Sequence, residues 1–157
     1  TPVSNFFFRV TAMTADGALL SRDIVEAMTQ EPYDDWAQTF SFSPSAYGKD
    51  QDPDGDGMIN SFERAYGSNP LLSDPEKAPY LTRTAGKVQL IYRYNTEVDE
   101  LTLVPEMSSD LQNWEDDTLL LDDSLKSTEG AVEVRQAEPV GTLPPALFMR
   151  VRIESPY

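Results

Sequence analysis

Residues 88–95 read VQLIYRYN, and their side chains alternate between two faces of an extended chain. One face carries Val88, Leu90, Tyr92 and Tyr94, and the residues between them fall on the other. Alternation with a period of two residues is typical of a β-strand with one face in the core. The stretch therefore predicts a strand, with both tyrosines on its buried face.

The same alternation recurs in three further segments of the last half of the chain, at 101–107, 132–134 and 147–153. Turn residues separate them: Ser108-Ser109-Asp110, Glu129-Gly130, and Gly141 with Pro144-Pro145. Several short alternating segments divided by turns indicate antiparallel sheets, in a sandwich or a small barrel. We expect a mainly β fold, with an antiparallel β-sandwich over residues 79–157.

The composition excludes most common catalytic sites. The 157 residues include 27 acidic and 12 basic residues, for a formal net charge of −15, and they include neither His nor Cys. Without these two residue types the chain lacks the usual general base, thiol nucleophiles, disulfides and the usual zinc ligands. Its negative charge disfavours binding to nucleic acid or to an anionic membrane surface. We therefore expect no enzyme and no partner of either kind.

Upstream of the predicted sandwich, residues 52–63 have the spacing of an EF-hand calcium loop. The fixed positions of such a loop are filled by Asp52, Asp54, Asp56, Gly57, Ile59 and Glu63. Ca²⁺ takes six to eight oxygen ligands, and alternate residues of a tight loop can surround it. The predicted ligands are the side chains of Asp52, Asp54, Asp56 and Glu63, the carbonyl of Met58, and Asn60 directly or through water.

Two alternative interpretations of this loop are an ordinary solvated turn and a magnesium site. Acidic residues with glycines also make ordinary solvated turns, but four close carboxylates without a cation repel one another. Mg²⁺ prefers a smaller octahedral shell that retains waters. Asp50 and Asp74 flank the loop, and either can join the metal site, although a helix-exit loop is a common place for an acid such as Asp74.

The loop resembles those of dockerins and thrombospondin type 3 repeats, because residues 45–49 do not form an entering helix. Residues 36–40 (WAQTF) and 52–74 (DPDGDGMINSFERAYGSNPLLSD) look like the calcium linker of large secreted bacterial proteins. Residues 108–114 (SSDLQNW) and 147–154 (LFMRVRIE) are similar to the C-terminal β domains that follow such linkers. A dockerin has two loops and this chain has one, so cohesin binding is not expected.

The first part of the chain predicts a β-hairpin, with an aromatic strand at 6–13 and an Asp16-Gly17 turn. Residues 21–29 suit a second strand better than a short helix. Residues 4–30 resemble the end of a fibronectin type III domain. Asp34 or Asp35 is expected to cap a short helix on which Trp36 and Phe40 share a face. The chain thus divides into a hairpin (1–31), a calcium-binding loop–helix linker (32–78) and the sandwich (79–157).

Other candidate sites are weaker. Asp116-Asp117 and Asp122-Asp123 suit either a second cation site or a catalytic carboxylate pair, but such pairs are common on solvated turns. Tyr80, Tyr92, Tyr94 and Trp114 suit a platform for sugar rings, although Tyr92 and Tyr94 share the predicted core face.

Two functions follow from these features. The first is a non-catalytic, calcium-stabilised structural module of a secreted or cell-surface protein, whose partner is the upstream part of the same protein. The second is a carbohydrate-binding module attached to a polysaccharide-degrading enzyme.

Overall fold

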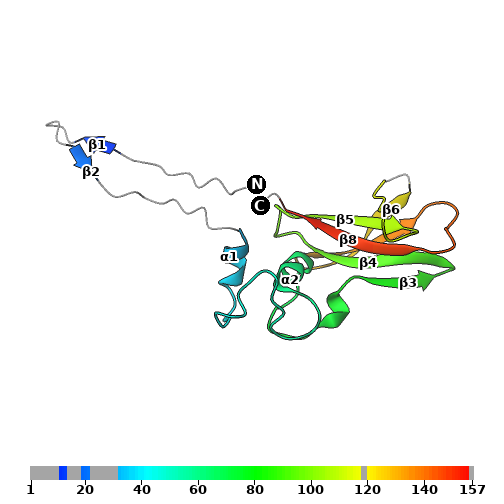
Figure 1. Cartoon of the computed structure of the whole chain (residues 1–157), viewed down its shortest axis with the longest axis horizontal. Coiled ribbons are helices and arrows are strands. Elements are labelled where there is room, and N and C mark those ends of the chain that lie inside the picture. Colours follow the sequence, from blue (N-terminus) through cyan, green and yellow to red (C-terminus); the bar gives the residue numbers. More distant parts are fainter. Residues whose placement is uncertain (1–10, 14–18, 22–31, 118–119, 156–157) are drawn as a thin grey trace.

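The structure is a computed structural model that describes residues 11–13, 19–21, 32–117 and 120–155 (Figure 1). Its strands are β1 (Thr11–Met13), β2 (Leu19–Ser21), β3 (Tyr80–Thr84), β4 (Lys87–Asn95), β5 (Thr102–Ser108), β6 (Leu121–Glu129), β7 (Val132–Pro139) and β8 (Phe148–Glu154). Its helices are α1 (Pro32–Ala37), α2 (Asn60–Tyr66) and the short 3-10 helix η1 (Pro75–Lys77). None of the helices in these ranges is long and apolar enough to cross a membrane.

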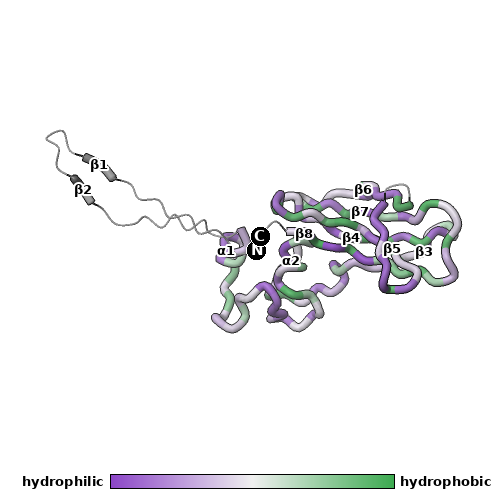
Figure 2. Tube along the Cα trace, turned by 45° about the horizontal axis from the view of Figure 1, so that its top comes forward, coloured by the Kyte–Doolittle hydropathy of each residue, from purple (hydrophilic) through white to green (hydrophobic). Residues whose placement is uncertain are grey.

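Two antiparallel sheets pack against each other, as the alternating pattern predicted. One sheet has the order β3-β4-β7-β6, and the other pairs β5 with β8. Hydrophobic and hydrophilic residues alternate along β7 and β8 in Figure 2. The core between the sheets contains buried residues of β4 and β7 and partly buried residues of β5 and β8: Leu90, Tyr92, Ala137, Leu103, Met149 and Val151. The fold is mainly β and sandwich-like.

β4 is covered on both faces. Residues 90–92 are consecutive, and each is at most 2% exposed. On the face opposite the sandwich core, Asn95 Nδ2 donates a hydrogen bond to the carbonyl of Arg64, at 3.1 Å. Arg93 Nε donates to the carbonyl of Tyr66, at 3.3 Å. Helix α2, which lies beside β4 in Figure 1, is therefore hydrogen-bonded directly to the sheet.

A second hydrophobic cluster joins α2 to the connection between β4 and β5. Its buried members are Met58, Ala65, Tyr66, Val98 and Leu101. Gly67 ends α2 in the left-handed conformation (φ 68°), and its amide donates to the carbonyl of Glu63. The loop–helix segment thus shares a core with the strands that follow it.

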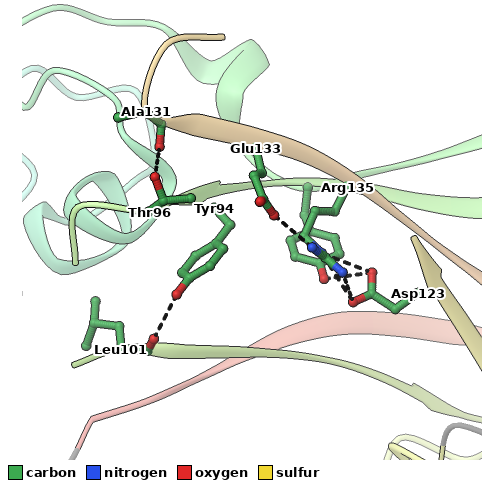
Figure 3. Close-up of polar contacts among 8 residues, drawn as sticks. Tyr94, Thr96, Leu101, Asp123, Ala131, Glu133 and Arg135 are labelled. Carbon is green, nitrogen blue, oxygen red and sulfur yellow. Dashed lines mark hydrogen bonds and ion pairs between the residues drawn. The ribbon is translucent and has the colours of Figure 1, made fainter. Parts of the chain in front are cut away.

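Polar contacts at one end of the sandwich fix the chain around β4 (Figure 3). The Tyr94 hydroxyl donates to the carbonyl of Leu101, at 3.5 Å, and the Thr96 hydroxyl donates to the carbonyl of Ala131, at 2.7 Å. Tyr94 is half-buried, whereas Tyr92 is 1% exposed. The predicted core position of Tyr92 is confirmed.

The sequence pattern missed two strands, β3 and β6. Both are at the edges of the four-stranded sheet. In β6 only Leu121 is buried, and a register shift between Leu125 and Ser127 breaks its pairing with β7. Edge strands with few buried side chains carry little periodic signal, because their conformation is imposed by the neighbouring strand.

The first part of the chain is described only in part. β1 and β2 pair antiparallel, with Thr11 opposite Ser21. The predicted Asp16-Gly17 turn, the rest of both predicted strands and most of the fibronectin-like segment lie outside the described residues. Helix α1 begins at Pro32, so the prediction that Asp34 or Asp35 caps it is wrong. Both acids lie in its first turn, because Pro32 supplies a first helical residue that needs no hydrogen-bond acceptor.

The aromatic contact predicted within the helical segment is present. Trp36 and Phe40 have ring centroids 5.0 Å apart. Phe40, however, lies beyond the end of α1 at Ala37, in the turn that follows it. The contact therefore joins the helix to its exit rather than two positions of one helix.

Candidate metal centre

The loop is folded around its first acid. Asp52 accepts hydrogen bonds from the amides of Gly55, at 2.8 Å, and Gly57, at 3.1 Å. Both glycines have positive φ angles, 75° and 95°, which other residues rarely adopt. The glycines therefore allow the reversal of the chain that aims their amides at the Asp52 carboxylate.

The next two acids turn the chain in the same way. Asp54 accepts a hydrogen bond from the amide of Asp56, at 3.2 Å, and Asp56 accepts one from the amide of Met58, at 2.8 Å. Each bond uses a single carboxylate oxygen. The other oxygen of Asp54 is buried and has no hydrogen-bond partner. Burial and the neighbouring negative charges raise the pKa of Asp54, although the bond from Asp56 opposes this.

Glu63 brings a fourth carboxylate from α2. Its side chain is 0% exposed, and neither of its carboxylate oxygens has a hydrogen-bond partner. Burial, followed by the charges of Asp54 and Asp56, raises the pKa of Glu63 from 4.5 to about 8. Burying a carboxylate without a partner costs free energy, and a cation bound here would compensate its charge.

The carboxylates form two groups that share Asp56. The first is Asp52, Asp54 and Asp56, and the second is Asp56, Glu63 and Asp74. Within each group the oxygens that can act as ligands lie within 4.8 Å of one another. Oxygen-only donors in this number suit a hard cation such as Ca²⁺ or Mg²⁺. The residues present therefore fit the cation that the loop spacing predicted.

Asp74 is the acid that sequence reasoning favoured less as a ligand. It lies after α2, is 5% exposed and belongs to the second group, so the structure brings it to the site. The exposed Asp50 belongs to neither group found among the described residues, and it accepts a hydrogen bond from Gln51 Nε2, at 3.3 Å. The only sequence signal for Asp74 was its position shortly after the helix that carries Glu63.

The two predicted ligands that are not acids have structural contacts. Asn60 Nδ2 donates to the carbonyls of Ala46 and Gly48, both at 2.8 Å, while its Oδ1 has no partner. The Met58 side chain is 2% exposed in the second hydrophobic cluster. The neighbouring Ile59 is only half-buried, so Met58 is the residue that anchors the loop in the core. Coordination by Asn60 and the Met58 carbonyl stays a prediction.

Three basic side chains near the loop each contact a different partner. Arg64 forms an ion pair with Glu100, and the Lys49 ammonium lies 5.5 Å from the centre of the Tyr33 ring. Lys77, which sequence reasoning missed, has its ammonium 2.5 Å from Asp74 Oδ2. No hydrogen bond of good geometry accompanies that contact.

One acid of each of the other two acidic pairs contacts an arginine. Asp116 pairs with Arg152, at 2.9 Å, and Asp123 accepts bonds from Arg135, which also contacts Glu133 (Figure 3). Among the described residues, neither predicted pair belongs to a group of three or more carboxylates close enough to hold a metal. Asp116 and Asp123 thus act as ion-pair partners of arginines.

The aromatic residues proposed as a sugar platform differ in how exposed they are. Tyr92 is buried and Tyr80 is 51% exposed. Trp114 is half-buried, and the Arg150 guanidinium lies 3.9 Å from the centre of its ring. One face of the indole is therefore already occupied.

Comparison of the chain with protein-family models, with curated proteins and with solved structures finds no match. The resemblances to thrombospondin type 3 repeats, dockerins and fibronectin type III domains therefore stay predictions.

Proposed function

We propose that the chain is a non-catalytic structural module that one calcium ion stabilises, within a secreted or cell-surface protein. The observation that carries the proposal is the Glu63 carboxylate, which is fully buried among other acids with both oxygens unpartnered. Such a group destabilises the fold unless a cation joins it. A bound calcium ion would neutralise the carboxylate and cross-link the loop to α2.

The cross-link acts on the sandwich because α2 is part of its packing. Met58 precedes the helix and shares a buried cluster with Val98 and Leu101 of the β4–β5 connection. The hydrogen bonds from Arg93 and Asn95 fasten the helix carbonyls to β4. A cation that fixes the start of α2 therefore also supports β4 and the chain that follows it.

Mass action gives the size of the effect. A ligand that binds only the folded state adds about 2.7 kcal/mol of stability at a concentration of 100 times its Kd. Calcium sites of extracellular modules have Kd values of about 10⁻⁴–10⁻³ M, which suits the higher calcium outside cells. Calcium is preferred over Mg²⁺ because the loop offers more than the one or two carboxylates that Mg²⁺ usually takes from a protein.

A thermal unfolding scan in excess calcium, in excess magnesium and in EDTA tests the proposal. We expect calcium to raise the unfolding midpoint of the wild type strongly and magnesium to raise it weakly. Asp56→Ala should lose the calcium response, whereas Asp50→Ala, which removes an exposed acid outside both groups, should keep it. A wild-type midpoint that is equal in calcium and EDTA would remove the basis of the proposal.

Polysaccharide binding has less support than the structural role. Of the candidate platform residues, Tyr92 is buried and Trp114 has Arg150 over its ring. A platform for a sugar needs a free aromatic face.

A further inference from the structure

Asp74 lies outside the twelve-residue loop, between the end of α2 and helix η1. Its backbone amide donates a hydrogen bond to Asp56 Oδ2, at 3.0 Å. This bond connects the segment that leads into β3 with the fifth position of the loop. It places the Asp74 side chain in the same group as Asp56 and Glu63.

The Asp74 carboxylate is poorly satisfied for its degree of burial. The residue is 5% exposed, and neither oxygen has a hydrogen-bond partner. The Lys77 ammonium approaches Oδ2, but its side chain is 30% exposed and brings one positive charge to three carboxylates. An ion pair with a partly solvated lysine compensates a buried acid only weakly.

We propose that Asp74 is a ligand of the same calcium ion, supplied from beyond the loop, an inference that rests on the proposed function. The fully buried, unpartnered Glu63 and the buried Asp74 have carboxylate oxygens within 4.8 Å of each other and of Asp56. Two carboxylates at that separation repel each other, whereas a cation between them attracts both. Ca²⁺ accepts up to eight oxygens, which leaves room for a ligand beyond those of the loop.

The inferred ligand changes what the ion connects. Asp74 is followed by η1 and then by β3, which pairs with β4 from Tyr80 onward. An ion held by the loop, by Glu63 and by Asp74 therefore joins three consecutive parts of the chain: the loop, α2 and the entry to the sheet. Lys77 is then the cation that partly replaces calcium at Asp74 when the ion is absent.

Terbium binding to the full chain tests this inference, because Tb³⁺ replaces Ca²⁺ at oxygen sites and its luminescence lifetimes in H₂O and D₂O count bound water. We expect Asp74→Asn to add about one water to the bound ion and to weaken calcium binding at least about tenfold. Asp50→Asn is the matched control, since it removes the same charge from an exposed position near the loop. It should leave the water count unchanged.

Lys77→Gln separates ligation from a structural ion pair and leaves Asp74 in place. If Asp74 binds the ion, this variant keeps the water count and binds calcium as tightly as the wild type or more tightly. If Asp74 serves only as the partner of Lys77, the variant weakens calcium binding as much as Asp74→Asn does, which overturns the inference.

Two further outcomes are distinguishable. Calcium binding by the wild type with an unchanged affinity and water count in folded Asp74→Asn overturns the inference and leaves the proposed function intact. Absence of calcium and terbium binding by the wild type overturns both. Circular dichroism of each variant confirms that it is folded before its affinity is compared.

Discussion

Replacement of Glu63 by glutamine should stabilise the calcium-free protein. The substitution keeps the shape of a side chain that is 0% exposed and removes its negative charge. In the wild type, burial and four neighbouring acids raise the pKa of Glu63 from 4.5 to about 8. The raised pKa means that the folded state favours the protonated form, so wild-type stability declines as the pH rises from 4.5 toward 8.

The magnitude follows from that interval. Near pH 7 the distance from 4.5 is about 2.5 pH units, and each unit corresponds to about 1.4 kcal/mol, which sets an upper value of roughly 3.5 kcal/mol. A buried amide that is incompletely hydrogen-bonded offsets about 1 kcal/mol of this gain. We therefore expect Glu63→Gln to raise the free energy of unfolding in EDTA by at most about 2.5 kcal/mol near pH 7. Near pH 4.5 the two proteins should be equal apart from that offset.

Calcium should remove most of the difference. At about 100 times the wild-type Kd, the ion adds about 2.7 kcal/mol to the wild type. If the loss of the carboxylate weakens binding about 100-fold, the same concentration adds only about 0.4 kcal/mol to the variant. The two proteins should then have nearly equal stability in calcium.

Urea unfolding at both pH values, in EDTA and in calcium, measures these four differences. Asp50→Asn serves as the control and should change stability little in any of the four conditions. A Glu63→Gln protein that is less stable than the wild type in EDTA near pH 7 would refute the reasoning, because it would show that the ionised carboxylate already has a favourable partner without a metal.

Three further predictions concern the sandwich. Met58→Ala should cost about 2–5 kcal/mol of stability in EDTA as well as in calcium, by urea unfolding, because it empties a core position that α2 shares with the sheet; an effect seen only in calcium would contradict the shared core. Gly67→Ala should lower the midpoint of thermal unfolding, because φ is 68° and the added Cβ would lie 2.5 Å from Val132 Cγ2. A second change, Val132→Ala, removes that clash and should restore part of the lost stability. Burial alone would raise the pKa of Glu106, but hydrogen bonds from two arginines of β8 outweigh it and lower that pKa. The stability from this lowered pKa is present above about pH 4.5 and lost as the pH falls through the folded value, so Glu106→Gln should flatten the acid side of the stability profile, and an unchanged acid limb would count against the arginine contacts.

The sequence predicted the acidic loop because its chemistry is local. Asp52, Asp54, Asp56 and Glu63 are set by the spacing that an ion requires along one short stretch. Asp74 reaches the same site through a hydrogen bond between its amide and Asp56, which no spacing rule contains. Contacts of this kind depend on how the chain returns after α2, and they become visible only in three dimensions.

Strands were predictable where one buried face requires apolar side chains at alternate positions. β4 and β8 have apolar side chains at every second position, so their strands follow from the pattern alone. β6 is almost entirely exposed, and its strand conformation depends on pairing with β7. The covering of β4 on both faces was also missed, because polar residues such as Arg93 and Asn95 do not indicate that a helix packs over them.

The hydrogen bonds inside the acidic loop have a kinetic consequence. The amides of Gly55 and Gly57 hold Asp52, and Asp56 holds the amide of Asp74, by contacts that need no ion. We expect these bonds to hold the loop in its binding arrangement before calcium arrives, so that the entropy of ordering it is lost during folding rather than during binding. Capture should then proceed at a rate near the diffusion limit, and the residence time of the ion should be the quantity that distinguishes one variant of the site from another.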